Sequence, residues 1–153
     1  MLLVFFGLPA TGKTFLAKEI SKTLGLQYLN MDNSSKNSIE SQLFFCKMGE
    51  FLEEKILTGK GVVVDGSFCL KSEREMLKEI AERKGIPIFF IEMTASRALI
   101  GERMTGNNAM LALYNKMQSQ FEPMLEPHLV VDSSMPFKKQ VERVKFYLQK
   151  KGK

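Results

Sequence analysis

The octapeptide Gly7-Leu8-Pro9-Ala10-Thr11-Gly12-Lys13-Thr14 has the spacing G-x-x-x-x-G-K-[ST] and lies between two segments with different hydrophobic patterns. The segment before it, 2–6, is a continuous apolar run too short for a helix, which is typical of a buried strand in a parallel sheet. The segment after it repeats apolar side chains at helical spacing until Gly25. The sequence therefore predicts a strand, a glycine-containing loop and a helix in this order.

In this context the octapeptide is predicted to be a phosphate-binding loop. Its glycines allow the backbone to wrap around phosphate oxygens, so that successive N–H groups and the amino end of the helix point at the anion. We expect Lys13 to reach the β- and γ-phosphates of a nucleotide and the Thr14 hydroxyl to bind Mg²⁺. The alternative is a turn without a ligand, and the flanking strand and helix argue against it.

Strands and helices alternate along the rest of the chain. Further strands are predicted at 26–30, 62–64, 87–93 and 128–131, and further helices at 38–58, 72–84, 95–104, 110–120 and 137–148. In the helix at 38–58, the side chains expected to be buried include Leu43, Phe51, Leu52 and Ile56. Ser72 and Glu75 have capping-box spacing and are predicted to begin the third helix. Such alternation predicts an α/β fold with a parallel sheet. No linker or repeat divides the sequence, so 1–153 is expected to be one domain.

Composition excludes several classes of protein. With 153 residues, 44% hydrophobic and 25% charged, the chain suits one globular domain rather than a disordered, collagen-like or coiled-coil protein. No apolar run approaches the roughly 20 residues of a membrane span, and no signal peptide is evident, so we expect a cytoplasmic protein without a membrane partner. A single histidine and two cysteines, Cys46 and Cys69, argue against a zinc site or a Ser-His-Asp hydrolase. Both cysteines are expected to be buried free thiols.

The net charge of +5 and the isoelectric point near 9.2 suit phosphorylated ligands or nucleic acid. Much of the excess lies in the segment 138–153, where a helix face in contact with solvent is the commoner explanation. Nucleic acid is therefore a partner that the charge allows but does not favour.

Three aspartates follow predicted strands, at the edge where open α/β sheets bind their ligands. Asp65 ends a run of three valines, as a Walker B carboxylate does, and is expected to hold Mg²⁺. Asp32 lies 19 residues after Lys13 and is expected to take the proton from an acceptor hydroxyl. For each aspartate the alternative is a role in a turn, and this is the interpretation we prefer for Asp132.

A guanidinium is expected to offset the charge of a transferred phosphoryl group, and Arg103 is preferred to Arg97 for this role. Arg103 directly precedes a polar stretch, and the region from about 97 to 110 is predicted to be a short lid. A solvent-exposed helix face is the alternative for both arginines. Arg74 and Arg83 are expected to face solvent. Core packing is expected for the ring side chains of Tyr114 and Phe121, although either could line a pocket.

Several segments occur in the order found in one family: the octapeptide, Val63-Val64-Asp65-Gly66-Ser67-Phe68 with Arg74, Phe90-Ile91-Glu92-Met93, Glu102-Arg103, Phe121-Glu122-Pro123 and Val130-Val131-Asp132-Ser133-Ser134. In these the chain resembles small P-loop kinases of the AAA-type ATP-binding group related to polynucleotide kinase, zeta toxin and chloramphenicol phosphotransferase. The resemblance covers nearly the whole chain.

The resemblance implies a P-loop NTPase fold with a five-stranded parallel sheet of order 2-3-1-4-5 and helices on both faces. It also implies ATP as the nucleotide, with Lys13 and Thr14 binding phosphate and Mg²⁺, Asp32 on the acceptor side and Arg103 in the lid. The chain departs from the family pattern at two places. Relatives commonly have a second lid arginine where this chain has 104–107, and an arginine after the acceptor-side aspartate where this chain has only Lys36 nearby.

The sequence thus predicts an ATP- and Mg²⁺-dependent kinase that moves the γ-phosphoryl group to a hydroxyl of a small molecule, a nucleotide or a nucleic-acid end. The absence of a second lid arginine motivates an alternative, a non-catalytic ATP-binding switch module that acts on a protein partner. The acceptor itself is not identified by the sequence.

Overall fold

The computed structural model describes residues 1–32 and 38–151. The strands are β1 (Leu2–Phe6), β2 (Gln27–Asn30), β3 (Val62–Asp65), β4 (Ile88–Thr94) and β5 (Leu129–Asp132), and the helices are α1 (Lys13–Leu24), α2 (Ser38–Leu57), α3 (Lys71–Arg83), α4 (Arg97–Arg103), α5 (Asn108–Gln120) and α6 (Phe137–Lys151). The predicted alternation of strands and helices is confirmed, with ends that differ by a few residues.

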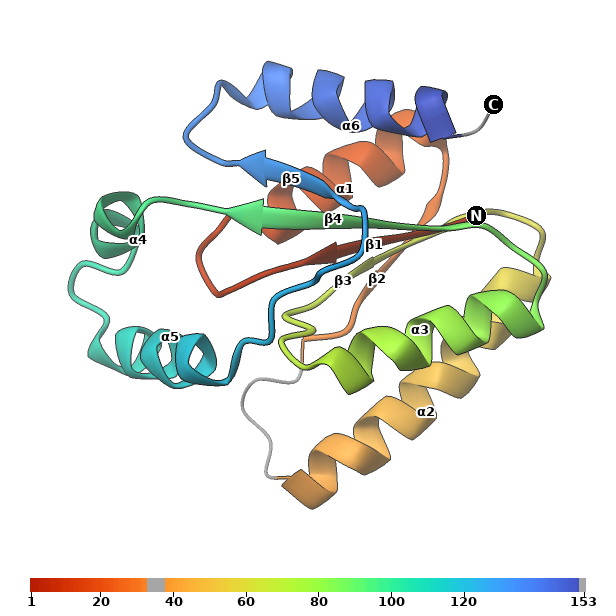
Figure 1. Cartoon of the computed structure of the whole chain (residues 1–153), viewed down its shortest axis with the longest axis horizontal. Helices are drawn as coiled ribbons and strands as arrows, with labels where there is room; N and C mark the ends of the chain where they lie inside the picture. Colours follow the sequence, from red (N-terminus) through yellow and green to blue (C-terminus); the bar gives the residue numbers. More distant parts are fainter. Residues whose placement is uncertain (33–37, 152–153) are drawn as a thin grey trace.

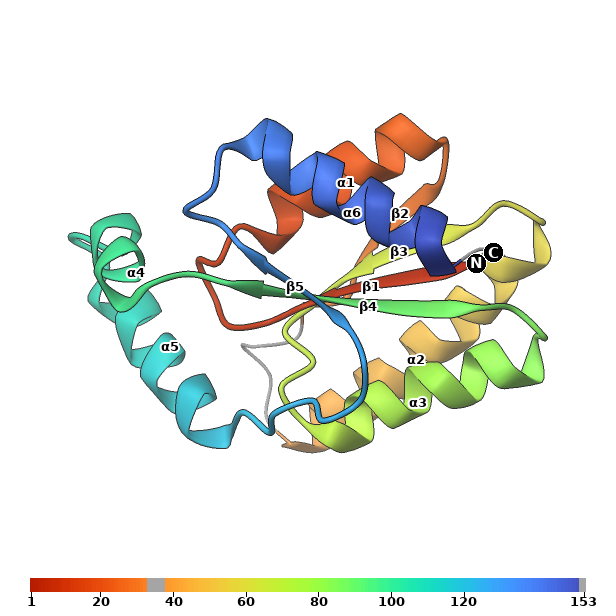
Figure 2. The same ribbon diagram turned by 45° about the horizontal axis from the view of Figure 1, so that its top comes forward.

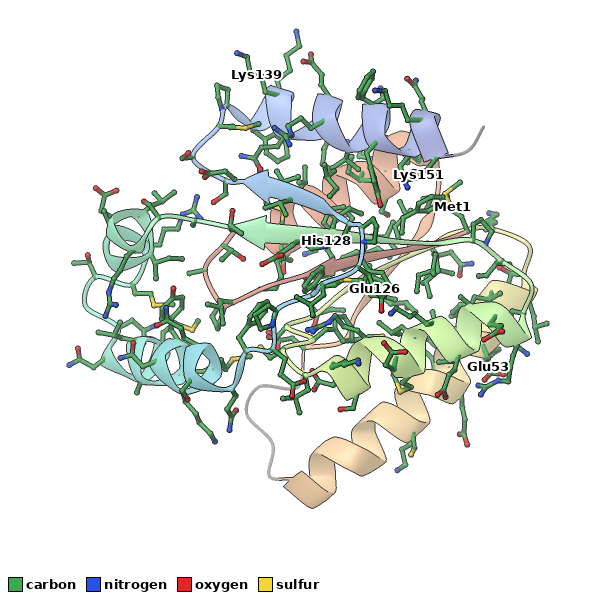
Figure 3. All side chains as sticks on the ribbon, in the orientation of Figure 1. Met1, Glu53, Glu126, His128, Lys139 and Lys151 are labelled. Carbon is green, nitrogen blue, oxygen red and sulfur yellow. The ribbon has the colours of Figure 1, made fainter. Side chains whose placement is uncertain are left out.

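The five strands form one parallel sheet in the order β2-β3-β1-β4-β5, as the resemblance implied. β1 is central: Val4 pairs with Val64 of β3 on one side and with Phe90 of β4 on the other. Because all strands run in one direction, their carboxyl ends meet at a single edge, and α4 and α5 lie beyond that edge (Figure 1). Met1 and Lys151 lie together at the opposite end (Figure 3).

Two hydrophobic layers cover the two faces of the sheet. The side chains of β1 alternate between them, with Leu2, Val4 and Phe6 in one layer and Leu3 and Phe5 in the other, and all five are fully buried. Figures 1 and 2 show α1 and α6 on one face and α2 and α3 on the other. Burial on both faces explains why β1 is a continuous apolar run.

A third, smaller cluster attaches α4 and α5 to the rest of the molecule. Ile100 and Met104 pack with Tyr114 of α5, and Leu8 and Ala10 of the octapeptide lie against them. The segment predicted as a lid thus comprises α4 and the beginning of α5, and it contacts the loop that follows β1.

The predicted capping box at Ser72 and Glu75 is wrong. Helix α3 begins at Lys71, and the Glu73 carboxylate accepts a hydrogen bond of 3.0 Å from the backbone N–H of Leu70, the N-cap residue. The chain therefore enters the helix two residues earlier than the spacing predicted. Glu75 instead lies on the outer side of α3 and pairs with Lys78 at 2.9 Å.

Two expectations about burial in α2 are also wrong. Leu52 and Ile56, four residues apart, form the face that packs on the core, whereas Phe51 is 38% exposed and Cys46 is exposed. Neither Phe51 nor Cys46 is three or four residues from Leu52, so both lie on other sides of the helix. Leu43, also predicted to be buried, and Lys36 lie outside the residues whose side chains are described.

The basic carboxyl-terminal segment forms α6, with Lys139 and Lys151 near its two ends (Figure 3). Its basic side chains face solvent, as predicted, while Val144 is buried in the layer formed with α1. Among the described helices, none combines the length and apolar character that crossing a membrane would need.

Candidate active site

The octapeptide forms a tight loop between β1 and α1. Gly7 has a φ of 136°, and a side chain there would come within 2.4 Å of the Met93 carbonyl oxygen, so only glycine fits between these strands. Gly12 has a φ of 88° and precedes the first residue of α1. The Thr11 hydroxyl donates to the Leu8 carbonyl oxygen at 2.8 Å and closes the loop on itself. Strand, loop and helix thus have the arrangement that the motif predicted.

Lys13 is buried at the start of α1, only 7% exposed, and its Nζ donates to the Leu8 carbonyl oxygen at 2.8 Å. Burial lowers the pKa of Lys13 from its usual value, while the carboxylates of Asp65 and Asp32 act in the opposite direction. The ammonium group is therefore poorly solvated and lies beside the loop backbone. An anion bound in the loop would offset both the desolvation of Lys13 and the positive end of the α1 dipole.

Thr14 and Asp65 meet across the ends of α1 and β3. The Thr14 hydroxyl donates to Asp65 Oδ2 at 2.6 Å, and the Asp65 side chain is almost fully buried. Tyr28 and Asn30 of β2 also donate to this oxygen, at 2.9 and 3.2 Å. Three donors hold the carboxylate in one orientation next to a hydroxyl, which gives Mg²⁺ the hard oxygen ligands that it prefers.

Asp32 lies just past the end of β2, and one of its contacts is with the loop after β3, where Ser67 Oγ donates to Asp32 Oδ1 at 3.3 Å. Asp32 and the octapeptide line the same cavity, which has a volume of about 330 Å³. The other side chains around it are Phe15 of α1 and Met110 and Leu113 of α5. The structure therefore brings Lys13, Thr14 and Asp32 together at one hollow, as the sequence predicted.

Arg103 reaches the same region from the end of α4. Its Nη1 donates to the carbonyl oxygen of Ala10 at 2.7 Å and to the hydroxyl of Ser133 at 3.0 Å. The guanidinium thus lies between the phosphate-binding loop and the loop that follows β5. Arg97 is exposed in the first turn of α4, which agrees with the solvent-facing interpretation.

The other residues singled out in the sequence have structural places. Asp132 ends β5, where its Oδ1 accepts from the N–H of Ser134 at 2.8 Å, so it is the turn residue that we expected. Tyr114 is buried in the cluster between α4 and α5. Phe121 stacks on Phe6, with ring centroids 6.5 Å apart and planes 5° from parallel. The packing interpretation of both rings is confirmed.

The expectation that Arg74 faces solvent is wrong. Its side chain is 2% exposed, and it donates to the carbonyl oxygens of Phe68 at 2.6 Å, Cys69 at 3.1 Å and Glu122 at 2.6 Å. Its guanidinium also lies 5.4 Å from the centre of the Phe6 ring. Arg74 therefore ties the loop after β3 to the segment after α5, whereas Arg83 is exposed as predicted.

Arg74 was missed because its partners are backbone carbonyls. The periodicity of apolar residues predicts which side of a helix is buried, and it places an arginine on the exposed side. The buried contacts come from a loop and from a turn 48 residues further along the chain, which a local pattern does not connect. The signal available in the sequence was the order of segments shared with the family, in which Arg74 follows the strand that ends at Asp65.

This chain is a P-loop protein by its architecture. A glycine-containing loop leads from the central strand of a parallel sheet into a helix, and helices cover both faces of the sheet. The chain belongs to the AAA domain family, whose match spans residues 2–124. This match agrees with the resemblance drawn from the sequence. No curated protein matches the chain closely.

Solved structures share the architecture over almost the whole chain. A sugar kinase from Janibacter sp., solved without ligand, has a TM-score of 0.78 at 17% identity, covering 97% of this chain and 94% of that one. An APS kinase from Mycobacterium tuberculosis in complex with AMPPNP and APS has a TM-score of 0.75 at 15% identity, covering 97% and 96%. Kti12 from Chaetomium thermophilum in complex with ADP-AlF3 has a TM-score of 0.73 at 14% identity, covering 98% of each. At these identities the likeness establishes the fold.

Proposed function

We propose that the protein is an ATP- and Mg²⁺-dependent phosphotransferase that moves the γ-phosphoryl group of ATP to a hydroxyl of an acceptor. The observation that carries the proposal is that Asp32 borders the same cavity as Lys13 and Thr14. Phosphoryl transfer to a hydroxyl needs a carboxylate that shares a cavity with a phosphate-binding loop. Membership of the AAA domain family and the kinase names of two structural neighbours support it.

Each group at the cavity has a proposed part in the reaction. Loop N–H groups and Lys13 bind the β- and γ-phosphates, and Arg103 offsets charge on the phosphate chain. Asp32 accepts the proton of the acceptor hydroxyl as its oxygen attacks the γ-phosphorus. The bond from that phosphorus to the β–γ bridging oxygen breaks, and its electron pair leaves with ADP.

The donor set at Thr14 and Asp65 fits a magnesium ion. The hydroxyl and carboxylate oxygens are 2.6 Å apart, and Mg²⁺ usually takes one or two such protein ligands and completes its shell with phosphate oxygens and water. Among the described residues there is no cluster of three or more histidine, cysteine or acidic side chains able to hold a metal, so an all-protein cage is not the type of site proposed. When bound, the ion would neutralise charge on the β- and γ-phosphates.

The acceptor site is proposed to lie between Asp32 and α5. Met110 and Leu113 supply apolar lining to the cavity that Asp32 borders. Such a pocket suits a hydroxyl compound that presents an apolar face as well as its reacting oxygen. Small molecules, nucleotides and nucleic-acid ends all remain in the class to be tested.

A second candidate function is a nucleotide-dependent switch that acts on a protein partner without phosphorylating an acceptor. Two observations favour considering it. The stretch 104–107 has no second lid arginine, and Kti12, a neighbour that is not called a kinase, shares the fold and was solved with ADP-AlF3. This function predicts nucleotide binding with no acceptor-dependent formation of ADP.

The deciding experiment offers γ-labelled ATP and Mg²⁺ with a panel of nucleosides, sugars, aminoglycosides, other antibiotics with alcohol groups, and oligonucleotides with a 5′-hydroxyl. Lys13→Ala is the inactive variant, and Lys18→Ala, which changes an exposed lysine of the same helix, is its matched control. Label that moves to a panel member with the wild type and with Lys18→Ala, but not with Lys13→Ala, establishes the kinase and its acceptor class. ATP binding without transfer to any member favours the switch.

A further inference from the structure

A pair of aromatic rings lies directly beside the phosphate-binding loop. Phe15 follows Thr14 in α1 and is 69% exposed, and its ring centroid is 4.7 Å from that of Phe137, the first residue of α6, with the planes 57° apart. Single exposed apolar residues are common and need no explanation by themselves. Phe15, however, also lines the cavity that contains Lys13 and Asp32. The exposed ring is therefore part of the site wall.

The two rings lie on the side of the site away from Asp32, the proposed general base. In the sheet order, β3 and β2 lie on one side of β1, and β4 and β5 lie on the other. Asp32 follows β2 and contacts Ser67 after β3, whereas Phe137 follows β5. The loop after β5 adjoins the phosphate-binding loop, since a Cβ on Gly12 would lie 3.6 Å from Ser133 Cβ.

We infer from this placement the direction in which a bound nucleotide would lie. The γ-phosphorus must face Asp32 for its hydroxyl acceptor to attack in line with the leaving oxygen. The nucleoside end of the triphosphate then extends away from Asp32, and the loop after β5, which adjoins the phosphate-binding loop, lies on that side. Phe15 and Phe137 are the exposed and half-buried aromatic rings that it would meet there.

We propose that Phe15 and Phe137 form an aromatic platform on which the nucleobase of the bound nucleotide stacks. From the proposed function, the proposal takes only that a nucleoside triphosphate binds in the phosphate-binding loop. Phe137 packs on the hydrophobic layer beneath it and supports the Phe15 ring, whose remaining face is open to the base. Stacking accepts any base because every base has a π face.

The platform predicts weak discrimination between adenine and guanine. The sequence has no N-K-x-D motif of the kind that reads guanine, and stacking on phenylalanine uses no donor or acceptor of the base edge. ATP and GTP are therefore expected to bind the wild type with dissociation constants within about tenfold of each other.

Titration calorimetry with ATP, GTP and inorganic tripolyphosphate, each with Mg²⁺, tests the platform. Phe15→Ala is expected to weaken ATP and GTP alike, by about 5- to 100-fold, and to leave tripolyphosphate within about twofold of the wild type. Phe15→Leu keeps apolar volume without a π face and is expected to recover only part of the loss, whereas Phe15→Trp recovers it. The natural chain has no tryptophan, so the indole fluorescence of Phe15→Trp comes from this one position, and its quenching by ATP, but not by tripolyphosphate, reports stacking directly.

The matched control is Phe146→Ala, which removes another exposed ring, on α6 but away from the cavity, and is expected to change no affinity. Unchanged ATP and GTP binding in Phe15→Ala would overturn the platform, as would an equal loss of tripolyphosphate binding. A wild-type preference well above tenfold for one purine would overturn stacking as the means of recognition. These assays need no acceptor, so a failure to find transfer leaves them readable. A wild type that binds neither nucleotide nor tripolyphosphate would overturn both proposals.

Discussion

The loops after β1 and β3 follow neighbouring strands and face the same site, but different contacts hold them. In the loop after β1, Thr11 and Lys13 both donate to the Leu8 carbonyl oxygen, so most of its side-chain hydrogen bonds are local, and Arg103 of α4 adds one at Ala10. In the loop after β3, the carbonyl oxygens of Phe68 and Cys69 accept from Arg74, a residue of the next helix. A loop with mostly local hydrogen bonds can be predicted from a short motif, whereas a loop whose carbonyl oxygens accept from the next helix depends on the packing of α3.

Both loops contain a non-glycine residue in a conformation that favours glycine. Ala10 has a φ of 61° and Phe68 a φ of 40°. Such residues cost on the order of 1–3 kcal/mol and persist only where the surroundings hold them. We therefore expect that removing these hydrogen bonds lowers the free energy of unfolding. The loss should be larger for the bonds from Arg74 in the loop after β3 than for the bond from Thr11 in the loop after β1.

The largest effect is expected from Arg74→Met. The change removes three hydrogen bonds to carbonyl oxygens, two of them buried, and a guanidinium beside the Phe6 ring, which together should cost roughly 3 kcal/mol of unfolding free energy. Urea unfolding followed by circular dichroism measures the loss. Arg83→Met, on the exposed side of the same helix, is the control and should change stability by less than about 0.5 kcal/mol. A loss below about 1 kcal/mol in Arg74→Met would contradict the account.

A smaller effect is expected from Thr11→Val in the loop after β1. The substitution keeps the shape of a buried side chain and removes one hydrogen bond, while Lys13 still donates to the same carbonyl oxygen. The loss should be about 1 kcal/mol in the same urea assay. Thr23→Val, on the exposed face of α1, is the matched control. If Thr11→Val destabilised the protein as much as Arg74→Met, the contrast between the loops would not hold.

The same contrast explains what could be predicted from the sequence. The sheet and the phosphate-binding loop followed from a buried apolar run and from spacing over eight residues, both of which are local. Asp32 and Asp65 could be placed together because parallel strands end at one edge. The role of Arg74 and the start of α3 at Lys71 depend on contacts between distant segments, and the sequence analysis was wrong on both.

Phe15 and Phe137 illustrate the same limit at the site. Phe15 stands beside the motif, but its partner begins the last helix, and the two meet only because β5 lies on the far side of β4 from β1. A hydrophobic pattern assigns Phe137 to the buried stripe of its helix and gives Phe15 no partner. Sheet order is what brings them together.

The smallest effect is expected in the pH dependence of stability, which the Cys69 thiol influences. Burial, with the nearby Glu73 carboxylate, raises the pKa of the Cys69 thiol in the loop after β3 to about 11, from a usual value of 9.0. In Cys46→Ser, NMR titration of the cysteine Cβ resonance should show a neutral thiol beyond pH 9 and thiolate only toward pH 11. Because the unfolded chain loses this proton first, stability should fall as pH rises through that window. A midpoint at or below 9 would mean that the loop is open to water.

The central claim is that Asp32 acts on the acceptor and not on the nucleotide, and it is tested most directly by measuring transfer and ATP affinity together in Asp32→Asn. We predict that transfer to the acceptor found in the panel falls by about 100- to 10,000-fold, while the dissociation constant of ATP stays within about twofold. Asp132→Asn, at the end of another strand and outside the cavity lining, should leave both values unchanged. If transfer and ATP affinity fell together in Asp32→Asn, or if neither changed, the assignment of Asp32 as the base would be wrong.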